Sequence, residues 1–242
     1  MGSQVSAKTN DKEQQLKKAS KMALIRSLLP IVGLVVIFLL FNVLTDFRMM
    51  GNMSLVLSQV YVTMIAAMGV FFIMTMGGLD FSQGSILGIS SIVVCIPSQK
   101  SIPLAIIGGI ASGAAIGAGE KAAMFSGIRT DKMKFLIYVL AGAITGFAAF
   151  INVIKVGSVT SSGGNQLETQ ILIALVLGGM PISGGAKVRF ENIVVGSLLY
   201  IVLNSGLTMM GFTTQMMQLI QGVVFLIFVA VFADRESIQV IK

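Results

Sequence analysis

This sequence of 242 residues contains no histidine, no tryptophan and a single cysteine, Cys95. Without histidine and with one thiol, it offers neither a Cys/His zinc cluster nor a Ser/His nucleophile pair, and it cannot form an intrachain disulfide. Charged residues are also scarce, at 11% of the chain, against about a quarter in soluble domains. We therefore expect a non-catalytic protein with no catalytic residues, no cofactor and no bound metal.

Apolar residues make up 55% of the chain, and the mean hydropathy is +0.91. They gather into runs that approach the roughly 20 residues a helix needs to cross the hydrocarbon core. We predict an all-α integral membrane protein, a polytopic helix bundle of about eight hydrophobic segments. The segments are 23–45, 53–76, 85–96, 102–118, 135–154, 169–179, 193–210 and 216–233. The third and sixth are the shortest, and these could re-enter the membrane rather than span it.

The net charge of +7 is distributed in a way that favours a membrane over nucleic acid. Polar, basic residues 1–22 form a tail, and residues 234–242 form a short polar end. If the tail lies inside and every segment crosses, 14 basic residues fall on the inner side, and only Arg48, Lys100 and Lys155 fall on the outer side. Because inner loops are enriched in lysine and arginine, both termini are predicted to be cytoplasmic. The first apolar run lacks a small-residue cleavage site after it, so we expect it to remain as an anchor.

Two apolar runs are followed by the same pattern, Gly-Gly-x-x-x-Ser-x-Gly, at residues 77–84 and 178–185. Helices interrupted by glycine are tolerated at membrane depth where they face protein or a water-filled cavity, an arrangement frequent in transporters. The repeat is either an internal symmetry or a coincidence in a chain with 27 glycines. Its residues are candidates for pore, gating or helix-cap positions: Asp80, Ser82, Gly84, Gly178, Gly179 and Ser183.

Asp80 is a carboxylate in an apolar setting, where a charge at the bilayer centre costs about 3 kcal/mol. One interpretation is a helix cap, in which Asp80 or Ser82 accepts from free amides of a helix that starts near Gly84. The other is an ion or substrate ligand. No second acid lies in a neighbouring apolar stretch, which disfavours an ion-driven carrier.

Small residues recur every fourth position in two segments. Such faces let neighbouring helices approach closely, so we interpret them as helix-packing positions rather than ligand sites. They are Ala105, Gly109, Gly113 and Gly117 in one segment, and Gly142 and Gly146 in the next.

Residues 119–134, "GEKAAMFSGIRTDKMK", form an inner connection with a short helix-forming stretch, a glycine and mixed charge. The connection is either a docking surface for a partner's groove or an ordinary solvated loop. A Walker A loop needs Gly-Lys followed by Ser or Thr, and this dipeptide is absent from the chain. Any ATP hydrolysis must therefore come from another protein.

Four ordered stretches resemble landmarks of permease subunits of bacterial ABC importers for ribose, galactose, xylose and related sugars. They are "GGLDFSQGSILGISSIV", "AAMFSGIRTDKMKFLIYVLAG", "ETQILIALVLGGMPISGG" and "NSGLTMMGF", and together they cover nearly the whole chain after the tail. The resemblance implies an inner-membrane subunit that forms a translocation path with a second permease copy, for which we expect a homodimer. It also implies cytoplasmic ATP-binding subunits and an extracytoplasmic solute-binding protein as partners.

The resemblance favours the docking interpretation of residues 119–134. It implies an ATPase-coupling loop made up of Glu120, Ala122, Ala123, Ser126, Gly127 and Ile128. Driven by the ATPase subunits, this loop would transmit rigid-body motion to helices beside the pore.

The chain also departs from this family. Relatives have about ten crossings, and they carry an additional stretch, long enough for two, between "GGIASGAAIGA" and "GEKAAMFSGI". The Glu-Leu-Asp that often precedes the late Gly-Gly motif is here Glu168-Thr169-Gln170, with one acid fewer. The alternative function is therefore a shortened relative that no longer transports and acts as a regulatory or assembly subunit.

Overall fold

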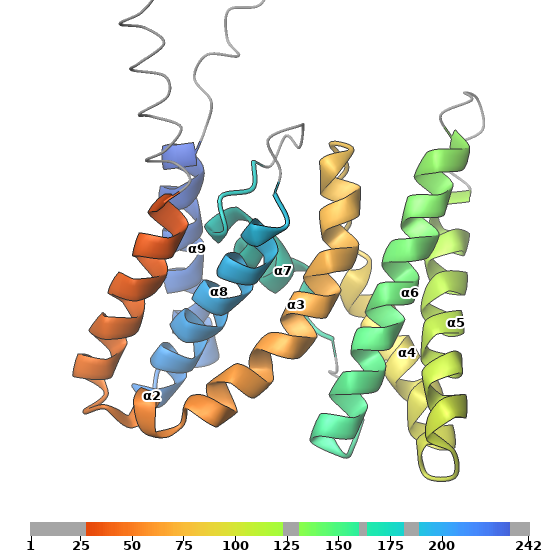
Figure 1. The fold of residues 1–242 in the computed structure, drawn as a ribbon, viewed down its shortest axis with the longest axis horizontal. Coiled ribbons are helices and arrows are strands. Elements are labelled where there is room, and N and C mark those ends of the chain that lie inside the picture. Colours follow the sequence, from red (N-terminus) through yellow and green to blue (C-terminus); the bar gives the residue numbers. More distant parts are fainter. Residues whose placement is uncertain (1–27, 123–130, 160–163, 182–188, 233–242) are drawn as a thin grey trace, which may run out of the picture.

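The computed structural model describes residues 28–122, 131–159, 164–181 and 189–232, and in these ranges every regular element is a helix (Figure 1). The first described helix is Leu28–Leu44. It is followed by α2 (Arg48–Gly51), α3 (Met53–Thr75), α4 (Gln83–Ser98), α5 (Ile102–Ala122), α6 (Asp131–Val156), α7 (Leu167–Leu177), α8 (Glu191–Met209) and α9 (Thr214–Phe232). Apart from the single turn α2, each helix corresponds to one predicted segment, so the all-α class is confirmed.

The helix boundaries extend beyond the apolar runs where polar residues can still be helical. Helix α5 continues to Ala122, four residues past the predicted end, because Glu120, Lys121 and Ala122 are strong helix formers. Helix α6 likewise begins at Asp131 rather than at residue 135. The connection expected over 119–134 is therefore shorter, and its first residues belong to α5 instead of to a separate helix.

Three helices are long and apolar enough to cross a membrane, namely Met53–Thr75, Lys132–Val156 and Glu191–Met209. The other apolar helices of the described chain are shorter. Outward-facing side chains of the first helix, such as Val36, Leu39 and Val43, are more than half exposed. In a bilayer these side chains would meet lipid, where exposed apolar surface carries no penalty.

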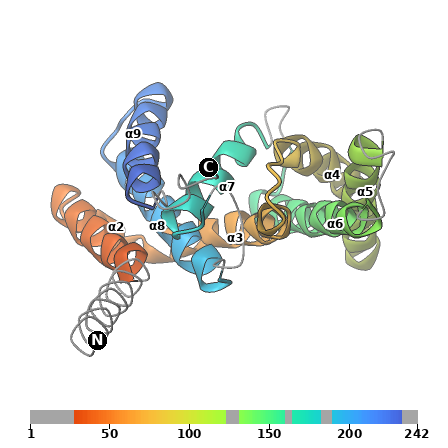
Figure 2. The same cartoon turned by 90° about the horizontal axis from the view of Figure 1, so that it is seen from above.

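Helix α3 lies between two groups of helices (Figures 1 and 2). Helices α4, α5 and α6 pack together on one side, and the first helix, α8 and α9 lie on the other. One buried cluster joins Phe41 of the first helix to Val60 of α3 and Leu199 of α8. A second cluster joins α3 to α4, α6 and α7 around Met74 and Leu87. Both groups are thus built against α3.

Helices α5 and α6 meet along a glycine seam formed by Gly109, Gly113 and Gly117 of one helix and Gly142 and Gly146 of the other. A Cβ added at Gly113 would overlap the Gly142 carbonyl oxygen, and one added at Gly146 would overlap the Gly109 carbonyl oxygen. The two backbones are therefore in direct contact, at the positions interpreted from the sequence as packing faces.

The described chain begins and ends at the same end of the molecule. Figure 1 places the start of the first helix and the end of α9 there, together with the ends of α5 and α6 that flank residues 123–130. This arrangement agrees with an even number of crossings.

The two Gly-Gly breaks end their helices in the same way but in different registers. Gly77 has φ +76°, and the Gly78 amide donates to the Ile73 carbonyl, as in a Schellman motif. After α7 the left-handed residue is Gly179, with φ +90°, and the Met180 amide donates to Leu175. The left-handed position is the first glycine in one break and the second in the other, so the sequence repeat is not repeated in backbone conformation.

Helix α4 begins near the middle of α6 rather than at its end. Ile73, in the last turns of α3, packs against Tyr138 of α6. The first residue of α4, Gln83, instead receives a hydrogen bond from Thr145, seven residues and about 10 Å further along α6. The non-helical connection therefore returns into the interior before α4 starts, as expected for a re-entrant break.

Candidate functional site

The cavity between α7, α8 and α9 has a volume of about 450 Å³, within the usual range for small-molecule sites. Residues of the break between α3 and α4 close one side of it. None of its described lining residues is charged. Its polar lining residues are Gln166, Thr169, Gln170, Tyr200, Asn204, Thr214, Gln218 and Gln221.

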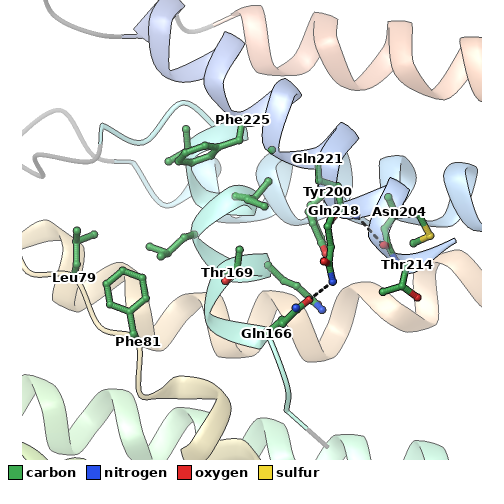
Figure 3. Close-up of a pocket in the computed structure, with 16 residues that line it drawn as sticks. Leu79, Phe81, Gln166, Thr169, Tyr200, Asn204, Thr214, Gln218, Gln221 and Phe225 are labelled. Carbon is green, nitrogen blue, oxygen red and sulfur yellow. Dashed lines mark hydrogen bonds between the residues drawn. The ribbon is translucent and has the colours of Figure 1, made fainter. Parts of the chain in front are cut away.

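Amide side chains form the polar part of the cavity (Figure 3). Gln221 of α9, only 6% exposed, donates to Asn204 Oδ1 of α8 at 2.9 Å. Nearer the surface, Gln218 donates to Gln166 Oε1 at 2.6 Å and links α9 to the start of α7. The amides thus join all three helices around one space.

The opposite part of the cavity is apolar. Leu79 and Phe81, from the break before α4, lie across from the amides in Figure 3. Both side chains are exposed to the cavity and its surroundings, at 41% and 62%. The non-helical backbone of this break therefore lies beside a cavity, the situation in which it is tolerated at membrane depth.

Asp80 is buried between these two residues but does not line the cavity. Its Oδ1 accepts from the Ser82 amide at 2.9 Å and from the Ser82 hydroxyl at 2.6 Å. Its Oδ2 accepts from the Gln83 side-chain amide at 2.8 Å, and Thr145 donates to the other end of that amide. This network of hydrogen bonds fixes the first residue of α4 against α6. Ser82 makes no side-chain cap of its own, because its hydroxyl is used by Asp80.

The starts of α4 and α7 lie against each other. A Cβ added at Gly84 would overlap the Glu168 carboxylate, and one added at Gly164 would overlap the Gly84 carbonyl. Each helix start has an acid close by, Asp80 for α4 and Glu168 in the first turn of α7. Carboxylates offset the positive ends of two helix dipoles that meet in this way.

The late glycines of the second break are packing positions. A Cβ added at Gly178 would overlap the Asn192 carbonyl, and one at Gly196 would overlap the Ala174 carbonyl, so α7 and α8 share a close seam. Gly179 provides the left-handed residue after α7. Ser183 lies outside the described residues.

The predicted coupling segment is described only at its beginning. Glu120 and Ala122 lie in the last turn of α5. Ala123, Ser126, Gly127 and Ile128 fall outside the described residues.

Sequence reasoning missed the amide cavity. Its polar residues come from three segments and no motif links them. A usable signal was present, because Asn204, Gln218 and Gln221 are uncharged hydrogen-bonding residues within the last two apolar segments. Burying such residues in an apolar medium costs free energy unless they are hydrogen-bonded.

Comparison with known proteins places this region in a transport context. Residues 115–229 match a family described as the permease component of branched-chain amino acid transport systems. The ribose import permease protein of Bacillus subtilis (strain 168) is 37% identical over 123 residues, which are 51% of this chain and 37% of that protein. Over about half of its length, this chain is similar to bacterial sugar import permeases. This chain also matches the xylose transport system permease protein of Haemophilus influenzae. The identity is 30% over 123 residues, which are 51% of this chain and 32% of that protein.

The similarity covers part of each protein. A third example is the galactose/methyl galactoside import permease protein of Escherichia coli (strain K12). It is 31% identical over 116 residues, which are 48% of this chain and 34% of that protein. The matched parts thus span about a third of these relatives' lengths. The family match contains three of the four sequence landmarks, all of α7 and α8 and most of α9, whereas "GGLDFSQGSILGISSIV" precedes it. No solved structure matches the chain.

Proposed function

We propose that this chain is the membrane-embedded, non-catalytic permease subunit of an ABC importer for a sugar or a similar small polar solute. The observation that carries the proposal is the match over residues 115–229 to transport permeases. That region includes α7, α8 and most of α9, the helices that surround an uncharged cavity. A permease of this kind would supply the translocation path, and separate cytoplasmic subunits would hydrolyse ATP.

The expected partners follow from the family. They are two cytoplasmic ATP-binding subunits, an extracytoplasmic solute-binding protein and a second permease copy, with a homodimer as our expectation. The chain would lie in the bacterial inner membrane with both termini in the cytoplasm. The coupling segment around Gly127 would then face the ATP-binding subunits, since residues 123–130 connect α5 and α6 at the end where the described chain begins and ends.

The decisive experiment is reconstitution. The chain would be co-expressed with candidate ATP-binding and solute-binding proteins from its source organism, purified in mild detergent and placed in proteoliposomes. We expect the ATPase to co-purify and labelled sugar to accumulate only with ATP and the solute-binding protein present.

Two outcomes contradict the proposal in different ways. Saturable solute movement by the chain alone would show that no separate ATPase is needed. An ATPase complex that forms without any uptake would favour the shortened, regulatory or assembly subunit. The observation that supports this second candidate is the direct join of "GGIASGAAIGA" to "GEKAAMFSGI", between which relatives carry an additional stretch.

A further inference from the structure

We propose that the cavity between α7, α8 and α9 is a discrete binding site for one acyl chain of a membrane phospholipid, with the ester groups of that lipid at the amide-lined end. The observation that carries the inference is a change in the lining from polar to apolar, in the same direction along α7 and along α9. Such a site is a property of the chain alone, so the inference does not depend on the proposed function.

The polar end of the cavity is formed where α7 and α9 begin. Both helices start at this end, because Gln218 donates to Gln166 Oε1 at 2.6 Å. Figure 1 places the start of α9 at the end of the molecule opposite residues 123–130. In a bilayer this end lies toward the interface, the region of the lipid headgroups and ester groups. The polar lining residues in or just before the first turns of the two helices are Gln166, Thr169, Gln170, Thr214, Gln218 and Gln221.

The lining becomes apolar further along both helices. Helix α7 contributes Ile173 and Val176, and helix α9 contributes Gly222 and Phe225. Gly222 leaves open space, since a Cβ added there would meet no atom within 4 Å. An acyl chain that extends from the polar end toward the middle of the bilayer would therefore lie against apolar side chains, as the hydrophobic effect requires.

The break before α4 gives the cavity an apolar rim. Leu79 and Phe81 line the cavity, and their side chains are 41% and 62% exposed (Figure 3). Exposed apolar side chains of this size mark surfaces that contact a membrane or another apolar partner. A lipid chain could thus enter sideways from the bilayer, past these two residues.

The amides favour a lipid ester over a ligand with many hydroxyl groups. Gln218 and Gln221 already donate to Gln166 and Asn204. Among the described residues none accepts from the Asn204 amide nitrogen. An ester carbonyl only accepts hydrogen bonds, so it matches a donor that is left over in this way.

A second copy of the chain is the competing apolar occupant, but it has another surface available. The faces of α9 that do not line the cavity carry their own exposed apolar side chains, and a second copy could pack there without entering the cavity. These residues are Met216, Leu219, Val223, Leu226 and Ile227.

The test uses fluorescence quenching, because the chain contains no tryptophan. Phe225→Trp introduces a single reporter in the lining. The purified full chain in detergent is titrated with phosphatidylglycerol or phosphatidylethanolamine brominated on the acyl chains, since bromine quenches tryptophan fluorescence on contact. Tyr61→Trp, half-exposed on α3 and outside the lining, reports non-specific quenching.

Two changes in the Phe225→Trp background probe the site. Gly222→Leu fills the open space, and Phe81→Gln makes the rim polar at an exposed position. Gly51→Leu is the matched control, because Gly51 has equally open surroundings and does not line the cavity. Thermal unfolding checks that each variant is folded.

We expect saturable quenching of Phe225→Trp, equal for the two lipids because no described lining residue is charged. Gly222→Leu should weaken lipid binding by about tenfold or more, since the new side chain displaces about two methylene groups of the lipid. Phe81→Gln should weaken it by about threefold. Gly51→Leu should leave it unchanged.

The inference is overturned if the quenching does not saturate, or if folded Gly222→Leu binds the lipid as tightly as the Phe225→Trp background does. Displacement of the lipid by D-ribose would overturn it in favour of a polar solute. A change from dimer to monomer in Gly222→Leu, with lipid binding unaffected, would assign the cavity to a second copy of the chain.

Discussion

The Gln83 side chain donates to Asp80 at 2.8 Å and accepts from the Thr145 hydroxyl. The first residue of α4 is thereby connected both to the break that precedes it and to the middle of α6. All three side chains are at most 2% exposed, with Gln83 and Thr145 fully buried. A buried network of this kind is stabilising only while each member keeps its partner.

Thr145→Val should therefore destabilise the fold. Valine has nearly the same shape but no hydroxyl, so the Gln83 carbonyl oxygen would be left buried without its donor, at a cost of about 1–3 kcal/mol. Chemical unfolding in mixed micelles measures this change. Thr145→Ser keeps the hydroxyl and should be closer to wild type. Equal stability of the Val variant and the wild type would show that the hydrogen bond contributes nothing.

Asp80→Ala should lower the amount of folded protein more than its activity. The change removes the acceptor of the Ser82 amide and of the Gln83 side chain while leaving the cavity lining intact. Fluorescence-detection size-exclusion chromatography in detergent would measure the amount of folded protein. Uptake would then be normalised to that amount. A normal level of folded protein with lost transport would instead make Asp80 a ligand or gating residue.

Gly113→Ala should destabilise the α5–α6 seam. The new methyl group would overlap the Gly142 carbonyl, and overpacking of this kind costs about 1–3 kcal/mol. Gly108→Ala is the matched control in the same helix, because its Cβ would lie 3.6 Å from Val93. The control should be neutral or slightly stabilising, since alanine is the better helix former by about 1 kcal/mol. Equal free energies of unfolding for Gly113→Ala and Gly108→Ala would show that the seam is not closely packed.

Gly127→Leu should uncouple ATP hydrolysis from uptake. A bulky side chain in the proposed coupling segment would disturb its fit to the ATP-binding subunits while leaving the helices outside that segment unchanged. Parallel assays of ATPase activity and sugar uptake in proteoliposomes would reveal continued hydrolysis with little uptake. Gly51→Leu, at a site remote from that segment, serves as the control. Unchanged uptake in Gly127→Leu would count against the coupling role.

Single cysteines should report the predicted orientation. Cys95 is the sole native thiol, so a Cys95→Ala background is free of cysteine. Phe212→Cys lies in the connection between α8 and α9, on the predicted outer side, and should react with an impermeant maleimide on intact spheroplasts. Arg189→Cys, just before α8, should react only after the membrane is opened. The reverse pattern would place both termini outside.

Helix positions were largely predictable because the bilayer imposes a simple length and hydropathy rule. The predicted segment 53–76 and the observed α3 differ by one residue, since both ends of that helix are apolar. Helices α4 and α7 begin two residues earlier than predicted, at Gln83 and Leu167. The early starts have a physical cause, because Gln83 and Glu168 are polar but are accommodated by contacts that a hydropathy pattern does not contain.

The cavity was not predictable in the same way. Gln166, Asn204 and Gln221 approach one another only after three helices pack, and the close seam that brings α7 against α8 depends on Gly178 and Gly196. The sequence pointed to Gly178 as a pore or cap residue and did not mark Gly196. Asp80, by contrast, was singled out from the sequence, although its partners Gln83 and Thr145 became evident only in three dimensions.

The glycine seam between α5 and α6 has a mechanical consequence. Where carbonyl oxygens rest directly on glycine α-carbons, no layer of side chains is present that could compress or change rotamer under load. Helices α5 and α6 would then tilt as one rigid body. A displacement applied where residues 123–130 join the two helices would reach the start of α4 through Thr145 and Gln83, with little of it absorbed on the way.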